Sequence, residues 1–389
     1  MKSQQGGVMC WNRCAARYAR HFKSTVHTLG LLVLCGGMSA CSSGSSNAAT
    51  REALSNGRTI GLVLANFDYM FYRTEDRKAE CPDGFVHTNR ENWEAQFPTR
   101  AARQRHLNLC GDFQNRGPNC ENVWLTPEVI DDPLPFREVR GKIAYGLDLD
   151  GEQDGRGTQT TCAHQQFTSP NGERGIDNQY YRFLGCEKGL SLFTNEIIKW
   201  AIEVYPVYRL LLEINGVDDE RRDDDIELVM YRGRDPLIVD AAGKAAPWQS
   251  QRIDEGAQKL IHRLRGKIVD GVVITEPADV IWEDSSWEPR LLIRGMTLRL
   301  KLTPTGAEGL RVGYIDVEQL WQVYSHWDAT TQFAFGGGAS GPAAYAALHR
   351  LADGYKDPAT GACTALSSTR KFEFVRAFVV HPSKEMTHE

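Results

Sequence analysis

The strongest clue to the fold is the alternation of apolar and charged residues in the segment 291–302. This segment reads LLIRGMTLRLKL, and from Met296 onward every second residue is apolar. A period of two is typical of a β-strand with one face in water. The turn-forming sequence TPTG at 303–306 and an apolar run at 310–317 follow, so a hairpin is expected. Four more runs have the character of strands: 58–66, 208–214, 226–231 and 371–380.

Helical patterns are fewer than strand patterns. Asp316 is a candidate cap for a helix that begins at Val317, and Pro342 and Gly354 frame a second helix. Residues 253–265 match a helical period, although a strand could begin inside them. Aromatic residues make up 10% of the chain, and its 36 glycines add to a composition that favours β-structure with many turns. We therefore expect a mainly β protein with some α, an antiparallel β-sandwich decorated by short helices and disulfide-held loops.

Two regions of the chain differ in pattern beyond its first 57 residues. After the first strand, residues 67–133 are rich in Arg, Asn, Asp and aromatic residues and contain three cysteines, with little clear period. We expect residues 58–139 to be an irregular, disulfide-containing N-terminal region. Residues 140–389 are expected to form a β-sandwich-like main domain that packs with it.

The first 40 residues have the layout of a signal peptide. They contain five basic residues and no acid, and an apolar run at 29–35 follows the basic stretch. That run of seven residues is much shorter than the ~20 residues that a membrane-spanning helix needs. The tetrad Met38-Ser39-Ala40-Cys41 resembles a bacterial lipobox, the cleavage site of lipoproteins. The resemblance implies that residues 1–40 are removed and that Cys41 carries lipid. Ordinary signal cleavage, or a short buried helix, is the alternative reading.

The residues after Cys41 suggest how the protein is held. Residues 41–57 include the sequence SSGSSNAAT, which is typical of a flexible tether. In lipoproteins a residue such as Ser42 after the cysteine implies sorting to the outer membrane, where the protein would face the periplasm or the cell surface. Without the five leader bases the chain keeps 40 basic and 50 acidic residues, a net charge of −10. Nucleic acid is therefore not an expected partner, whereas the membrane is one through the lipid anchor.

Six cysteines remain beyond Cys41, and an even number in an oxidising compartment predicts up to three disulfides. Six cysteines allow 15 pairings, so connectivity does not follow from the sequence. Short separations favour two local bridges, and the remaining two cysteines would then join the ends of the chain. The favoured pairs are Cys162–Cys186, Cys110–Cys120 and Cys81–Cys363.

Alternating carboxylates in the segment 146–157 (GLDLDGEQDGRG) suggest a cation site. Carboxylates on a turning backbone can converge on Ca²⁺, which takes 6–8 oxygen ligands. From Asp150 the sequence begins like an EF-hand loop, but its twelfth position is Thr161 rather than Glu, so an EF-hand is excluded. A solvated turn is the alternative reading. The favoured Cys162–Cys186 bridge would fold Asp177 back towards this segment. The expected calcium ligands are therefore Asp148, Asp150, Asp154 and Asp177.

Three further segments are candidate sites. In WEDSSW at 282–287, Trp282 and Trp287 flank two carboxylates, a pattern found in sugar-binding surfaces, although tryptophans also serve packing. The acidic stretch 217–225 could hold a cation but is better explained as a solvated loop. The sequence Cys-Ala-His at 162–164 could be part of a zinc site, but a disulfide is expected there instead.

No catalytic motif is present in the sequence, and no catalytic residue is assigned. We therefore expect a lipid-anchored bacterial envelope protein that is not an enzyme, is stabilised by calcium and binds a ligand or partner. The expected partners are a glycan, an apolar small molecule or an outer-membrane protein. One alternative is a secreted hydrolase that acts on a polysaccharide or ester through carboxylates of the 148–177 region. Another is a structural envelope lipoprotein.

Overall fold

The computed structural model describes residues 57–188, 202–205, 209–282, 291–331 and 339–382. All of them belong to one compact unit, residues 48–389. Cys41 and Trp287 lie outside the described residues. Within the described part of the chain, no helix is both long enough and apolar enough to cross a membrane.

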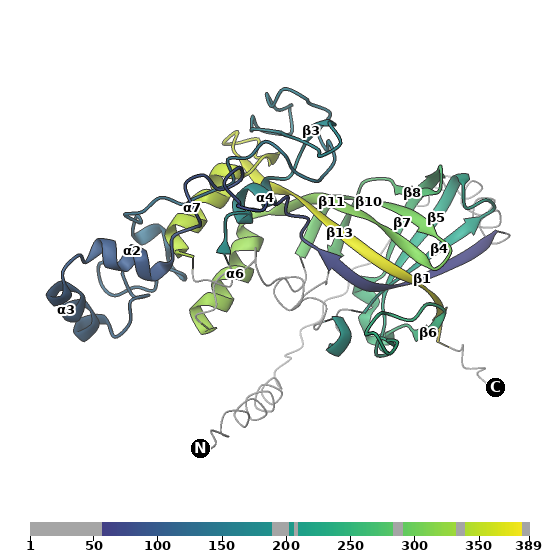
Figure 1. Ribbon diagram of the computed structural model, residues 1–389, viewed down its shortest axis with the longest axis horizontal. Helices are drawn as coiled ribbons and strands as arrows, with labels where there is room; N and C mark the ends of the chain where they lie inside the picture. Colours follow the sequence, from purple (N-terminus) through teal and green to yellow (C-terminus); the bar gives the residue numbers. More distant parts are fainter. Residues whose placement is uncertain (1–56, 189–201, 206–208, 283–290, 332–338, 383–389) are drawn as a thin grey trace, which may run out of the picture. The chain divides into compact units, whose positions relative to one another are not determined.

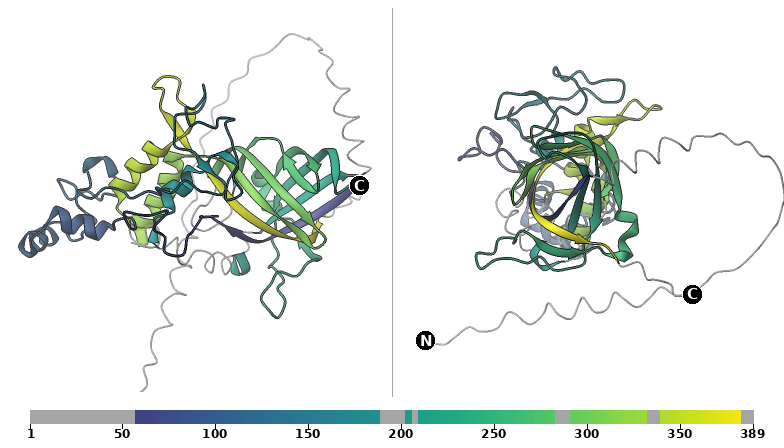
Figure 2. Two further views of the ribbon diagram at one scale, coloured as in Figure 1. Left: turned by 45° about the horizontal axis from the view of Figure 1, so that its top comes forward. Right: turned by 90° about the vertical axis from the view of Figure 1, so that its right-hand side faces the viewer.

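Eight antiparallel strands close into a barrel, which is seen nearly end-on in the right-hand view of Figure 2. Each strand pairs with the next in the order β1-β4-β5-β7-β8-β10-β11-β13, and β13 pairs in turn with β1 (Figure 1). The strands are β1 (Arg58–Asp68), β4 (Leu210–Val217), β5 (Arg222–Arg232), β7 (His262–Val269), β8 (Val272–Thr275), β10 (Leu291–Thr303), β11 (Gly306–Asp316) and β13 (Cys363–Val380).

The alternation in β10 is confirmed by its burial. Met296, Leu298 and Leu300 are buried, whereas Arg299 and Lys301 are exposed. The expected hairpin is also present, because β10 and β11 pair along their length up to the turn.

The expected β-sandwich is wrong, because the sheet closes on itself. The long strand β13 pairs with β11 through Gly306↔Val375 and with β1 through Leu62↔Arg376. One strand thus joins the first and last parts of the sheet. The sequence period shows which residues of a strand are buried but not which strand lies beside it, so a sandwich and a barrel have the same pattern.

Shorter elements surround the barrel. Residues 253–265, which matched a helical period, form a 3₁₀-helix and then the start of β7. The helix expected at Val317 is α6, and Asp316 caps it by accepting hydrogen bonds from two backbone N–H groups, both at 3.1 Å. The helices are α2 (Asn89–Gln96), α3 (Arg100–Cys110), α4 (Gln179–Leu184), α6 (Val317–Thr331), α7 (Gly341–Leu351), η2 (Pro127–Val129) and η4 (Glu255–Leu260). The outer strands are β2 (Phe167–Thr168), β3 (Arg174–Ile176), β6 (Gln249–Arg252), β9 (Ala278–Trp282) and β12 (Gly354–Lys356).

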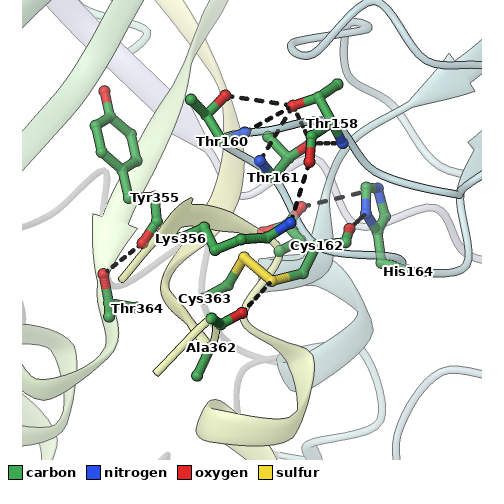
Figure 3. The surroundings of a disulfide bond; sticks show 12 residues. Thr158, Thr160, Thr161, Cys162, His164, Tyr355, Lys356, Ala362, Cys363 and Thr364 are labelled. Atoms are coloured by element: carbon green, nitrogen blue, oxygen red, sulfur yellow. Dashed lines mark hydrogen bonds and ion pairs between the residues drawn. A yellow bond between two sulfur atoms is a disulfide. The ribbon is translucent and has the colours of Figure 1, made fainter. Parts of the chain in front are cut away.

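Three disulfides hold the loops. Cys110–Cys120 is confirmed, but the other two favoured pairs are wrong, because the structure has Cys81–Cys186 and Cys162–Cys363 (Figure 3). The backbone explains the exchange. Val86 N–H donates to the Cys186 carbonyl, which aligns the Cys81 segment with the end of α4. Cys162 N–H donates to the carbonyl oxygen of Asp353, which lies between α7 and β12. Asp353 N–H in turn donates to the carbonyl oxygen of Ala365, near Cys363 at the start of β13.

Candidate functional site

A buried polar cluster forms beside the Cys162–Cys363 disulfide. Its members come from three separate segments: His164 follows the disulfide by two residues, Asp177 lies between β3 and α4, and Asp353 lies between α7 and β12. The side chains of His164, Asp177 and Asp353 are 6%, 0% and 0% exposed. The disulfide joins the His164 segment to β13 (Figure 3). Backbone hydrogen bonds add the other two segments: Cys162 N–H donates to the Asp353 carbonyl oxygen at 2.8 Å, and Asp177 N–H donates to the Leu147 carbonyl oxygen at 3.0 Å.

The imidazole of His164 faces an acceptor at each nitrogen. Nδ1 lies 2.8 Å from the Cys162 carbonyl oxygen, and Nε2 lies 2.8 Å from Asp177 Oδ1. Both nitrogens therefore donate, which makes the ring an imidazolium. Burial lowers the pKa of His164, but the hydrogen bond to Asp177, the charge of Asp353 and the bond to the carbonyl outweigh it and raise the pKa to about 9.

Asp353 has only one of its carboxylate oxygens satisfied. One oxygen accepts a hydrogen bond of 2.7 Å from the Ser367 N–H. The other, Oδ2, has no hydrogen-bond partner among the described residues, and His164 Nε2 lies 3.9 Å from it. Burial raises the pKa of Asp353 to about 7, although His164 and Ser367 favour the charged form. A buried oxygen left in this way calls for a proton or a cation nearby.

Asp150 joins His164 and Asp177 as a third candidate metal ligand in this cluster. One ligand atom from each of Asp150, His164 and Asp177 lies within 4.8 Å of the others. Thr161 Oγ1 donates to Asp150 Oδ2 at 2.8 Å, and Leu149 N–H donates to Asp177 Oδ2 at 2.7 Å, so both carboxylates are oriented. One imidazole and two carboxylates suit Zn²⁺ and related first-row metals. The bond from His164 Nδ1 to a backbone carbonyl is the outer contact that metal-binding histidines usually make.

Only two of the four residues expected to bind calcium lie in the cluster. Asp150 and Asp177 belong to the cluster. Asp148 is exposed and accepts a hydrogen bond from Gly151 N–H at 2.7 Å, while Asp154 is exposed and pairs with Arg156 at 2.7 Å. Neither is part of the cluster found among the described residues.

Two members of the cluster were not expected from the sequence. The sequence suggests His164 only as part of a zinc fragment with Cys162, which is in a disulfide instead. Asp353 had no local signal, because its neighbours in the chain give no motif. Trp282, a candidate ligand residue, is 2% exposed and packs edge-on against Phe372, with ring centroids 5.1 Å apart.

A cleft of about 790 Å³ opens beside the cluster, and Asp150 lines it together with Tyr314 and Tyr355. The Arg294 guanidinium stacks over the Tyr355 ring at 5.0 Å, and Lys356 Nζ donates to the Thr158 carbonyl at 3.1 Å (Figure 3). Burial, followed by the charges of the neighbouring acids, raises the pKa of Tyr314, so its hydroxyl keeps its proton. Five threonines also line the cleft: Thr158, Thr160, Thr161, Thr297 and Thr364.

No protein-family model, curated protein or solved structure matches this chain. The functional argument therefore starts from the cluster and the cleft themselves.

Proposed function

We propose that this is a lipid-anchored bacterial envelope protein that binds a polar ligand in the cleft, with a divalent metal ion held at one wall by Asp150, His164 and Asp177. The observation that carries the proposal is the buried, unpartnered oxygen of Asp353 beside His164. A divalent cation at His164 would place more positive charge beside this oxygen than the His164 imidazolium, 3.9 Å away, supplies.

The donor set favours a transition metal over the calcium expected from the sequence, because Ca²⁺ takes oxygen ligands and imidazole suits Zn²⁺. On binding, the metal replaces the proton on His164 Nε2, while Nδ1 keeps its hydrogen bond to the Cys162 carbonyl. Thr161 and Leu149 continue to orient the two carboxylates. The metal thereby links the loop at 147–164 to the start of α4.

The lining of the cleft supports a polyhydroxylated ligand such as a glycan. Threonine hydroxyls, the Tyr314 hydroxyl and the cations Arg294 and Lys356 offer hydrogen bonds, and the Tyr355 ring offers an apolar face. The lipobox resemblance and the three disulfides support an envelope location.

The metal site is tested by thermal melting of the protein after treatment with EDTA. Zn²⁺ at about 100 times its Kd should add about 2.7 kcal/mol of stability. The gain should disappear in His164→Gln and remain in the control His349→Gln, which changes a histidine that is 42% exposed and paired with Glu318. Equal stabilisation of both variants by Zn²⁺, or stabilisation of the wild type by Ca²⁺ alone, would show that the assignment is wrong.

The ligand is tested by screening the zinc-loaded protein against glycans. Binding should weaken at least tenfold in Tyr355→Ala, which removes the apolar face and the platform for Arg294. Unchanged glycan binding in this variant would place the ligand elsewhere.

Metal-assisted hydrolysis is a second candidate, favoured by the position of Asp150 in the cleft wall. Three protein ligands leave coordination positions for water or substrate, as in catalytic zinc sites. Chromogenic glycoside and ester substrates distinguish the two functions. Zinc-dependent turnover that is lost in His164→Gln would identify a hydrolase.

A further inference from the structure

A second candidate binding site lies where β4 begins and where β5 and β9 end. The described residues there line a small, partly open cavity of about 20 Å³, enough for a group of the size of a water molecule. Its apolar walls include Leu210, Met230, Leu260 and Ile281, and its polar lining includes Arg209 and Trp282.

Two buried side chains in this lining have N–H groups without acceptors. Arg209 is 0% exposed, and its Nε donates to the Asp235 carbonyl at 3.0 Å. Its Nη1 and Nη2 have no hydrogen-bond partner within the described structure, and neither has Nε1 of Trp282. A buried N–H without an acceptor is costly, and a buried guanidinium is more so.

The positive charge of Arg209 is not compensated by the acids that neighbour it in the sequence and the sheet. Asp235 directs its carboxylate to Arg252 at 2.5 Å, and Asp254 accepts from Arg232 at 2.7 Å. Burial alone lowers the pKa of Arg209 to about 10, so the side chain remains charged at neutral pH. This position therefore holds a buried cation whose counter-charge the described residues do not supply.

The backbone next to Arg209 is shaped to admit its side chain. Gly233 lies opposite, and a Cβ at this position would be 2.7 Å from Arg209 Cγ and 3.1 Å from Leu211 Cδ1. Any larger residue would displace the arginine stem. The close fit indicates that the guanidinium is held in place rather than free to turn to solvent.

We infer that the cavity binds a small monovalent anion, either chloride or the carboxylate of a small ligand, between the Arg209 guanidinium and the Trp282 indole N–H. Both groups are donors that an anion can accept from at once. A water molecule would fill the space but would leave the buried charge uncompensated. The site shares no residue with the cluster of Asp150, His164 and Asp177, and its test does not depend on a metal ion.

The test is thermal melting in EDTA at constant ionic strength, in sodium gluconate titrated with sodium chloride or sodium acetate. Gluconate is too large for the cavity. Chloride or acetate at about five times its Kd should raise the Tm by roughly 2 °C. An effect of chloride indicates a free halide, and an effect of acetate alone indicates a ligand carboxylate. Both support the site, whereas no effect of either anion overturns it.

Variants connect the effect to the cavity. Arg209→Gln should abolish it, Trp282→Phe should weaken the anion at least fivefold while keeping the ring, and Gly233→Ala should weaken it by displacing Arg209. Arg263→Gln is the control, because this arginine is 59% exposed and pairs with Glu227. An equal anion effect in Arg209→Gln and in the wild type would contradict the inference.

Two further measurements keep the inference testable if Arg209→Gln does not fold. Crystals of the wild-type protein soaked in bromide should show an anomalous peak within hydrogen-bonding reach of Trp282 Nε1 and the Arg209 guanidinium, and its absence overturns the site. Glu283 follows Trp282 in the chain. If anions stabilise Glu283→Gln but not the wild type, the protein supplies its own carboxylate and the inference is wrong.

Discussion

The metal-free protein should lose stability as the pH rises from about 6.5 to 9, because of His164. The pKa of this histidine is about 9 in the folded state, against an ordinary value of 6.5. Between these values the folded protein holds a proton that the unfolded chain has released. The stabilisation is therefore complete below pH 6.5 and is lost as the pH rises through 9.

The size of the effect follows from the pKa difference. The pKa of His164 in the folded state exceeds its ordinary value by about 2.5. At 1.36 kcal/mol for each pKa unit, this difference corresponds to about 3 kcal/mol of unfolding free energy. The side chain is only 6% exposed, so solvent does little to screen it. Asp353 acts in the same direction at lower pH, because burial raises its pKa to about 7 from 3.8. The folded state holds this proton too, and stability also declines as the pH rises from about 4 to 7.

Urea unfolding in EDTA at pH 6, 7, 8 and 9, followed by tryptophan fluorescence, measures this decline. His164→Gln should flatten the profile above pH 6.5, while the control His349→Gln should keep it. Parallel profiles for the wild type and His164→Gln would falsify the assignment of the effect to His164. With Zn²⁺ present the sign reverses, because the metal competes with the proton on Nε2, so stabilisation by zinc should grow with pH.

Three further predictions concern the anchor, the disulfide and the sheet. Cys41→Ser should abolish labelling by radioactive palmitate and release the protein from membranes, and a labelled variant would contradict the lipobox reading. Replacing both Cys162 and Cys363 by Ser should cost about 5 kcal/mol of unfolding free energy in urea, because the bridge spans 201 residues, and a loss below about 1 kcal/mol would contradict the role of the bridge. Gly309→Val should destabilise the fold by at least about 2 kcal/mol or prevent folding, since a Cβ at this position lies 1.9 Å from the Arg299 carbonyl oxygen. A thermal melt within 2 °C of the wild type would show that β10 and β11 can separate to admit the side chain.

The candidate cation site could be predicted from the sequence only in part. Of the four carboxylates predicted as calcium ligands, Asp150 and Asp177 lie in the cluster with His164. Asp148 and Asp154 have the same local pattern but are exposed in the structure. Spacing along a turn shows which carboxylates could converge, whereas the direction of each side chain depends on the hydrogen bonds of the folded loop.

Local patterns in the sequence were enough to predict several strands and helices of this protein. The alternation from Met296 produced β10, and Asp316 set the start of α6, because both depend on residues close in the chain. The pairing of β13 with β1, the bond between Cys162 and Cys363 and the position of Asp353 beside His164 follow from the folded structure and not from such patterns. These contacts join segments up to about 300 residues apart. The β13–β1 contact depends on strand pairing across the closed sheet, and a disulfide and a buried ion pair hold the other two contacts, none of which a local pattern encodes.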